Sequence, residues 1–178
     1  RLQSLQSQLH GSRLFNRWKA EWGVQGMLMK NSNERGTGVV PVIPNYTETT
    51  FGTYAIAKYL GDIWGTEAGV RYDNQLTRAD GYDWTGRRYG GNRHFENVTF
   101  TLGGHQHLGN LLTLSTNFGM AWRAPHVYEL YSNGNELSSG TFVKGDSTLR
   151  SEQSYKWVTS LCYHDSWVHA RIDAYLQW

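Results

Sequence analysis

The stretch from residue 79 to residue 95, ADGYDWTGRRYGGNRHF, brings aromatic rings together with guanidinium groups and an imidazole. Guanidinium groups bind anions through a fork of N–H donors, and they also stack on aromatic rings. We therefore expect this stretch to bind an anionic small molecule or to stack against sugar rings. The alternative is a glycine-rich surface loop without a ligand. The candidate ligand-binding residues here are Tyr82, Trp84, Arg87, Arg88, Tyr89, Arg93 and His94.

Histidines are the second group of interest, because imidazole is a common ligand of metals and haem. His105 and His107 are spaced to share one face of a strand, which we expect to point into a barrel lumen. The sequence offers no evident third ligand, so solvated polar side chains are the favoured interpretation. We predict no metal site and no cofactor.

Catalytic signatures do not occur in the sequence, which has no nucleophile beside a base, no Gly-x-Ser-x-Gly elbow and no phosphate-binding loop. We therefore do not expect an enzyme. The single cysteine, Cys162, has no second thiol with which to form a disulfide or a thiolate metal site. The net charge of +2 is spread along the chain, so nucleic acid is not an expected partner.

The composition suits a protein wall that faces lipid. Aromatic residues make up 14% of the chain and charged residues 18%, against roughly 25% charged residues in a typical soluble domain. No stretch approaches the ~18 apolar residues that predict a membrane helix. The mean hydropathy of -0.59 is typical of a soluble protein. It does not argue against a barrel, in which lipid-facing and lumen-facing residues alternate. Residues 1–10 lack the apolar core of a signal peptide, so we expect either its removal or a chain that is a segment of a longer protein.

A hydrophobic period of two runs through most of the chain and predicts β-strands. In the segment that begins at Trp18, apolar side chains alternate with polar ones, and the same alternation is clearest at 168–178. The other predicted strands cover 64–73, 97–107 and 112–122. Residues 51–60 also resemble a strand, but Tyr54 and Ile56 compete with Phe51, Ala55 and Tyr59 for the apolar face. The phase of residues 1–10 is equally unclear.

Short and long connections alternate between these strands. Gly61-Asp62, Gly109-Asn110 and Asp165-Ser166 have the composition of compact hairpin turns. The long polar links cover residues 30–50, 79–95 and 123–150 and show no helical periodicity. Outer-membrane barrels have this asymmetry, with short periplasmic turns and long extracellular loops. We therefore place the compact turns in the periplasm and the long links outside the cell.

The positions of five tryptophans also favour an outer-membrane barrel. They lie at or near the ends of predicted strands, where such barrels carry aromatic girdles at the membrane interface. They are Trp18, Trp64, Trp122, Trp167 and Trp178. A soluble β-sandwich or a lipocalin-like barrel is the alternative fold, since its strands also alternate.

The segment WRAPHVYELY at residues 122–131, with GDSTLRSEQSYKW at 145–157, resembles a pattern found in TonB-dependent outer-membrane receptors. That pattern is Phe-Arg-Ala-Pro, Glu-Leu-Tyr and Gly-Asn-Pro-x-Leu-Lys-Pro-Glu. VIPNY at 42–46 and EAGVRYD at 67–73 fit its upstream order. The matching positions are Trp122, Arg123, Ala124, Pro125, Glu129, Leu130, Tyr131, Leu149 and Glu152. The departures are Trp122 in place of Phe, Asp146 in place of Asn, and Ser147 and Ser151 in place of Pro.

The pattern also has a physical interpretation of its own. Pro125 cannot donate a ladder hydrogen bond, so we expect it to end the strand that begins near Leu111. Arg123 then lies at the barrel rim. Glu152, where the chain re-enters the wall, is placed to pair with Arg123 or Arg150. We expect these residues to organise the base of a loop rather than to contact a ligand directly.

Haem-uptake receptors that carry this pattern are known for a histidine in the loop that follows it. In this chain His126 follows Pro125 immediately, and residues 132–144 contain no histidine. His126 is therefore a candidate ligand contact, but haem ligation is not the favoured interpretation.

The resemblance implies an all-β fold, namely antiparallel transmembrane strands that form a fragment of a larger, 22-stranded outer-membrane barrel. It implies uptake of a scarce solute such as a ferric siderophore, haem or an oligosaccharide. The implied partners are outer-membrane lipid, the receptor's own plug domain and the TonB protein. We count about eight strands and predict that residues 1–178 are a partial barrel domain without the plug. Two alternatives remain: a small outer-membrane barrel with an adhesive or structural role, and a secreted carbohydrate-binding β-domain.

Overall fold

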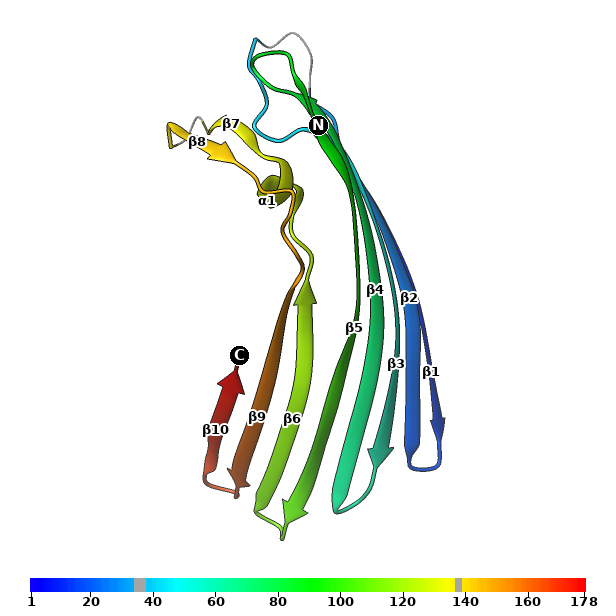
Figure 1. Cartoon of the computed structure of the whole chain (residues 1–178). Coiled ribbons are helices and arrows are strands. Elements are labelled where there is room, and N and C mark those ends of the chain that lie inside the picture. Colours follow the sequence, from blue (N-terminus) through cyan, green and yellow to red (C-terminus); the bar gives the residue numbers. More distant parts are fainter. Residues whose placement is uncertain (34–37, 137–138) are drawn as a thin grey trace.

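The structure is a computed structural model that describes residues 1–33, 38–136 and 139–178. Its main element is an eight-stranded antiparallel sheet with the order β1-β2-β3-β4-β5-β6-β9-β10. Figure 1 shows this sheet as one tall curved wall. The strands are β1 (Leu2–Phe15), β2 (Trp18–Asn31), β3 (Asn45–Leu60), β4 (Trp64–Tyr82), β5 (Arg88–Leu108), β6 (Leu112–Arg123), β9 (Glu152–His164) and β10 (His169–Gln177).

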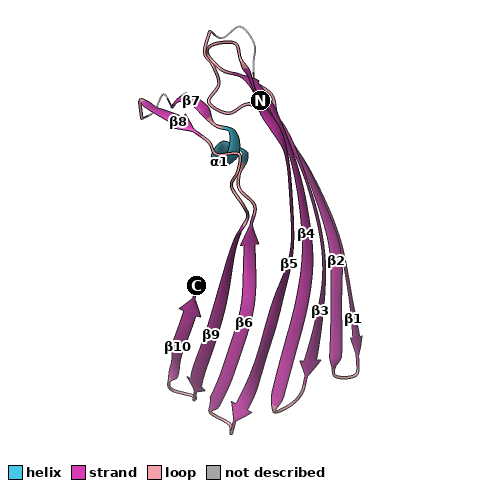
Figure 2. Cartoon of the chain, in the orientation of Figure 1, coloured by secondary structure: helices cyan, strands magenta, loops and turns pink. Residues whose placement is uncertain are grey.

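The connection between β6 and β9 carries the remaining elements, which are α1 (Val127–Tyr131) and a small hairpin of β7 (Asn133–Glu136) and β8 (Thr141–Lys144). Figure 2 shows that helix α1 and this hairpin lie at the end of the wall opposite the short turns. Among the described residues, no helix is long and apolar enough to cross a bilayer.

The register places apolar side chains in rows on one face of the wall. Trp22, Ala55, Val70 and Phe100 stand opposite one another on β2, β3, β4 and β5. Trp22 and Phe100 are exposed, as expected for side chains that face lipid. This register assigns Phe51, Ala55 and Tyr59 to the apolar face, which settles the phase of residues 51–60.

An aromatic belt lies on the same face near the short turns. The ring of Tyr59 lies 5.2 Å from that of Trp18 and 4.6 Å from that of Trp64, measured between centroids. Such belts anchor barrels at the membrane interface. The belt therefore marks one boundary of the membrane.

The opposite face is polar and carries ion pairs. Lys58 lies 3.7 Å from Glu21 and 3.6 Å from Glu67, and so links three strands. Arg71 binds the carboxylate of its neighbour Asp73 at 2.6 Å. A hydrated or protein-filled lumen suits such a face, whereas lipid does not.

The main sheet has eight strands, the number expected for the barrel wall, and the three compact turns are confirmed, but one turn was missed. Residues 1–10 belong to a full strand, which pairs with β2 through a tight turn at Asn16 and Arg17. Asn16 has a φ of 54°, a left-handed conformation that asparagine tolerates better than most residues. The predicted turns at 61–62, 109–110 and 165–166 each join two paired strands.

The prediction of a long loop at 79–95 is wrong, because β4 and β5 run on to Tyr82 and Arg88. Two of the glycines that suggested a loop, Gly81 and Gly91, are sites of close approach. A Cβ at Gly91 would meet the Tyr131 hydroxyl at 3.0 Å, and one at Gly81 would meet the Pro44 side chain at 2.8 Å. The remaining link, residues 83–87, is organised by the Asp83 carboxylate, which accepts hydrogen bonds from Thr85 and Arg87.

The other two long links are shorter or more ordered than predicted. The link at 30–50 contracts to 32–44, because β3 begins at Asn45. The link at 123–150 holds α1 and a hairpin, although no helical periodicity is visible in a helix of five residues. Residues 34–37 and 137–138 of these two predicted links lie outside the described residues.

Candidate functional site

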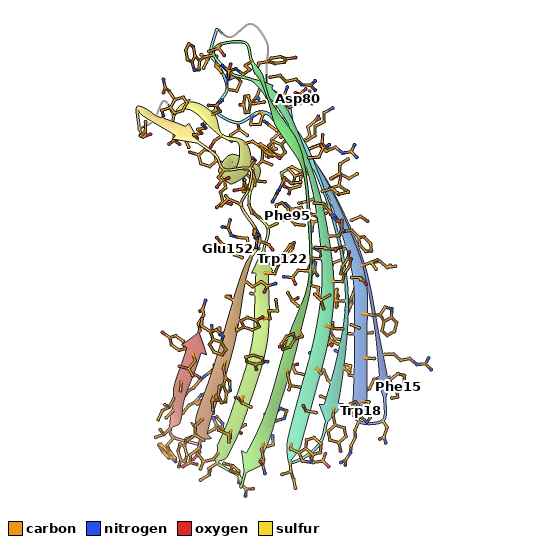
Figure 3. The ribbon with its side chains drawn as sticks, viewed as in Figure 1. Phe15, Trp18, Asp80, Phe95, Trp122 and Glu152 are labelled. Carbon is orange, nitrogen blue, oxygen red and sulfur yellow. The ribbon has the colours of Figure 1, made fainter. Side chains whose placement is uncertain are left out.

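Helix α1 folds back onto the polar face of the wall at the end that bears the long links. Val127 and Leu130 are 0% and 1% exposed, and they form a cluster with Tyr131 and three wall residues. The wall residues are Tyr46 of β3, Ala79 of β4 and Phe95 of β5. Figure 3 shows Phe95 on this part of the wall, close to Trp122 at the end of β6. A folded loop thus occupies the lumen side of the barrel mouth.

The start of α1 is determined by a local capping arrangement. The His126 Nδ1 atom accepts a hydrogen bond from the backbone N–H of Tyr128 at 3.2 Å. In return, the Glu129 carboxylate accepts from the backbone N–H of His126 at 2.7 Å. This reciprocal pair is a capping box, with histidine where serine or threonine is usual.

Arg123 connects both ends of the loop to the wall. Its Nη1 and Nη2 atoms donate to the two carboxylate oxygens of Glu129, and its Nε atom lies 3.2 Å from Glu152. The predicted pairing of Glu152 is therefore confirmed, and its partner is Arg123. The Arg123 guanidinium, followed by the His126 backbone N–H, holds the pKa of Glu129 below its usual range.

The second half of the loop returns along α1. The backbone N–H groups of Gly145 and Asp146 donate to the carbonyls of Ser132 and Glu129 at 2.7 and 2.9 Å. A Cβ at Gly145 would lie 2.7 Å from the backbone of Leu130, so glycine is required there.

Asp146 and Ser147 occupy two positions at which the chain departs from the receptor pattern. The Asp146 carboxylate accepts a hydrogen bond from the backbone N–H of Thr148 at 2.8 Å and a second one from the Thr148 hydroxyl. The Thr148 hydroxyl and N–H together lower the pKa of Asp146. Because an asparagine oxygen can accept the same bonds, Asp146 retains the turn that Asn would form. Nothing in the structure explains Ser147 in place of proline.

Arg93 ties the loop to β5 from the other side. Its Nη2 atom donates to the Leu149 carbonyl at 2.6 Å, and its guanidinium carbon lies 5.1 Å from the centroid of the Phe95 ring. Arg93 was expected to contact ligand. Ligand contact by Arg93 stays a prediction, and the structure adds that its guanidinium binds the loop.

The candidates at 79–95 do not form one cluster, because alternation along β4 and β5 sends them to opposite faces. Tyr89 and Arg93 share the face of Phe95, whereas Tyr82, Arg88 and His94 share the face of Phe100. Arg88 is bound to Asp80 at 2.6 Å, and His94 to Asn74 at 2.7 Å. Trp84, 75% exposed, and Arg87 lie in the link at the tip of the hairpin.

Trp122 does not join the lipid-facing girdle in which it was expected. It is only partly exposed and packs, together with Ala124, against the cluster around α1. As predicted, the strand ends directly after it, at Arg123. Pro125, two residues later, is buried.

His126 is exposed and faces residues that sequence reasoning missed. Its ring meets the Tyr46 ring edge-on, with 6.5 Å between centroids. The buried carboxylate of Glu48 lies on the same strand face as Tyr46 and accepts from Gln75 at 3.1 Å and Thr77 at 3.5 Å. The sequence signal that could have found these residues is the alternation along β3, which places Tyr46 and Glu48 on one face and Thr47 and Thr49 on the other.

His105 and His107 share the polar face near the short turns, as expected. Their rings lie 5.6 Å apart, and His107 shares a hydrogen bond with Thr113 at 2.9 Å. Within the described residues no group of three or more His, Cys, Asp or Glu side chains is arranged to hold a metal ion.

Solved structures of similar fold span the whole chain. The Serratia marcescens hemophore receptor HasR, solved as a double mutant with its hemophore HasA and heme, has a TM-score of 0.81 and 19% identity. The copper transporter OprC has a TM-score of 0.77 and 15% identity. The ferric yersiniabactin uptake receptor FyuA from Yersinia pestis has a TM-score of 0.64 and 15% identity. Each match covers 99% of this chain, but the chain spans only 32%, 30% and 28% of those proteins.

No curated protein matches the chain. A model of the family described as TonB dependent receptor-like, beta-barrel, matches residues 3–178. The wall of antiparallel strands, with one lipid-facing and one polar face, is the fold expected of such a barrel segment. The chain belongs to the β-barrel family of TonB-dependent receptors, which are outer-membrane proteins.

Proposed function

We propose that this chain is the part of an importer barrel that shapes the extracellular mouth, in a receptor that takes up a ferric siderophore by TonB-energised transport. The observation that carries the proposal is the loop at 124–151, whose helix α1 is buried against the lumen side of β3, β4 and β5. A loop held there narrows the entrance, so a solute must pass it.

The charge at the entrance favours an anionic solute. Arg87 and Trp84 are exposed at the tip of the β4–β5 hairpin, which extends beyond the rest of the wall (Figure 1). An arginine beside an indole ring is suited to bind carboxylate, catecholate or hydroxamate oxygens and to stack on planar groups. Haem and oligosaccharides are the competing solutes.

The polar face of the wall supports a plugged lumen. Its ion pairs, such as Lys58 with Glu67, are half-exposed in this chain and would be covered by a domain inside the barrel. We propose that residues 1–178 are a partial barrel domain, and that the plug and the contact with the TonB protein belong to other parts of the receptor. Uptake is then a property of the whole receptor.

The test is growth of a strain that lacks the full-length receptor gene, on a ferric siderophore, on haem or on an oligosaccharide as the limiting source. We expect loss of growth on the siderophore and recovery with the wild-type gene. Recovery should fail with a Trp84→Ala, Arg87→Ala gene that still yields folded receptor. If growth is lost on haem alone or on the oligosaccharide alone, that compound is the transported solute and the ferric siderophore is not. Unchanged growth on all three sources would exclude uptake of these solutes.

A further inference from the structure

Two histidines face each other at the turn of the last hairpin in the wall. Strand β9 ends at His164 and β10 begins at His169, and the two residues are directly opposite in the register. The turn between them is closed by a hydrogen bond from the Asp165 N–H to the Val168 carbonyl at 2.9 Å. Figure 1 shows this turn at the same end of the wall as the other short turns, the end that barrel topology assigns to the periplasm. A hydrogen-bonded hairpin thus fixes the spacing of the two histidines.

Both histidines lie on the polar face of the wall. His105, Ser115 and Ser160 stand opposite one another on β5, β6 and β9, so Ser160 shares the face of His105. His164 is an even number of residues from Ser160 along β9 and lies on the same face, as does its partner His169. Both side chains are exposed. An ion can therefore reach the pair at the rim of the lumen.

The spacing of the two rings is that of imidazoles bound to one tetrahedral metal ion. Their centroids are 5.2 Å apart, and their planes stand at 90° to each other. A zinc–nitrogen bond of about 2.0–2.1 Å places each ring centre about 3.2 Å from the metal, and a tetrahedral angle of about 109° then separates the two centres by about 5.2 Å. The right angle of square-planar coordination would bring the centres to about 4.5 Å. The observed distance matches the tetrahedral value.

The two rings are also free to take a ligand. Within residues 1–33, 38–136 and 139–178, neither the His164 nor the His169 side chain forms a hydrogen bond or an ion pair. Arg171, the cation two residues along β10, is neutralised by Asp173 at 2.7 Å and so repels an incoming cation less. No group of three or more His, Cys, Asp or Glu side chains is formed in this part of the chain. Water would therefore complete the coordination of an ion that the two imidazoles bind.

The other histidine pair on this face is less suited to a metal ion. The rings of His105 and His107 are 5.6 Å apart, and their planes stand at 64°. His105 lies over Gly65 of β4, where a Cβ would be 2.5 Å from its Cε1 atom, whereas His107 shares a hydrogen bond with Thr113 of β6. The two rings thus associate with strands on opposite sides of β5. This pair is a matched control for the pair at the β9–β10 turn.

We propose that His164 and His169 form a binding site for a divalent transition-metal ion, and that Zn²⁺ is the ion that fits its tetrahedral spacing. Because only two ligands come from the protein, the ion should bind reversibly. Bound zinc would tie the ends of β9 and β10 together at the periplasmic rim of the lumen. Mg²⁺ prefers oxygen ligands and should not bind there.

The experiment uses the full-length receptor, purified in detergent without a histidine tag and treated with a chelator. Its histidines are modified with diethyl pyrocarbonate in the presence of Zn²⁺, of Mg²⁺ or of neither ion, and mass spectrometry locates the modified residues. We expect Zn²⁺ to slow the modification of His164 and His169 several-fold. His105 and His107 should keep their rates, and Mg²⁺ should have no effect. Unchanged rates at His164 and His169 in Zn²⁺, or equal protection of His105 and His107, would overturn the proposal.

A zinc titration of variants by calorimetry gives a second measurement. Glutamine keeps an exposed position polar, so the variants should fold as the wild type does. The variant with His164→Gln and His169→Gln should lose one equivalent of bound zinc. The control variant with His105→Gln and His107→Gln should bind as much zinc as the wild type. Unchanged zinc binding in the first variant, or an equal loss in the control, would contradict a site at the β9–β10 turn.

Discussion

Arg123 holds Glu129 in a two-pronged ion pair, with its Nη1 and Nη2 atoms 2.9 and 3.0 Å from the two carboxylate oxygens. The same guanidinium reaches Glu152 at the start of β9, so one side chain joins both ends of the 124–151 loop. Paired groups as exposed as these contribute little to global stability. Their effect should therefore be local to the loop.

Replacement of Arg123 by alanine should loosen the loop without unfolding the barrel. We expect backbone amides at 126–132 to exchange hydrogen for deuterium several-fold faster, while amides of β3 and β4 keep their rates. Arg17→Ala is the control, because Arg17 forms a comparable pair with Asp62 beside the short turns. Unchanged exchange in α1 would show that Arg123 does not anchor the loop.

The loop should also loosen in acid because of Glu129. Its pKa is lowered in the folded loop, chiefly by the Arg123 side chain. The ionised Glu129 carboxylate therefore stabilises the folded loop fully above its pKa in the unfolded state, about 4.3. This stabilisation is lost as the pH falls through the lower pKa of Glu129 in the folded loop. A spin label at the exposed position 142 should become more mobile over that range in the wild type.

In Glu129→Gln the acid-dependent mobility should diminish, and the label should already be more mobile at neutral pH. Part of the response should remain, because the pKa of Asp146 is lowered as well and acts with the same sign. Identical pH profiles for the wild type and Glu129→Gln would contradict this role of Glu129.

Leu130 is one of the buried side chains through which helix α1 packs against the wall. This side chain is 1% exposed among Tyr46, Ala79 and Phe95. Its truncation to alanine should cost about 2–5 kcal/mol of docking free energy and release α1 from the lumen side. Deuterium exchange in α1 should then approach that of an unprotected peptide, whereas truncation of the exposed Phe142 should leave it unchanged.

The strands could be predicted because their signals are local. Alternation reveals a strand that is apolar on one face, and Gly, Asn or Asp marks the turn between two strands. The phase of 51–60 could not be predicted, because Tyr54 and Ile56 are large residues on the polar face. Only the pairing of Ala55 with Trp22 and Val70 decides it.

The candidate site was harder to predict because its determinants are not local. Gly81 and Gly91 suggested a loop from composition, yet each is small because a distant residue, Pro44 or Tyr131, packs against it. Adjacency in sequence suggests one cluster at residues 79–95, whereas a strand alternates their faces. The capping residue Glu129 follows His126 by three positions and could have been recognised by that spacing.

Gly52 offers a test of the polar face. A Cβ at this position of β3 would lie 2.7 Å from the Asp73 carboxylate, within the Arg71–Asp73 pair. Gly52→Ala should therefore displace the Arg71–Asp73 pair and lower the thermal midpoint of the folded barrel. Gly26→Ala on β2 is the matched control, because its nearest neighbour would be 3.9 Å away. Equal midpoints for the two variants would contradict the close packing around Gly52.

Two residues of the β4–β5 hairpin, Trp84 and His94, should differ in their effect on ligand binding. Trp84 lies at the tip and is exposed to arriving solute, whereas His94 faces outward and is bound to Asn74. In full-length receptor titrated with the ferric siderophore that supports growth, Trp84→Ala should weaken binding about tenfold or more, a loss typical of an aromatic contact residue. His94→Ala should bind as the wild type does, because its side chain lies on the lipid-facing side. A loss in His94→Ala that matches or exceeds the loss in Trp84→Ala would mean that the solute is recognised on another face of the hairpin.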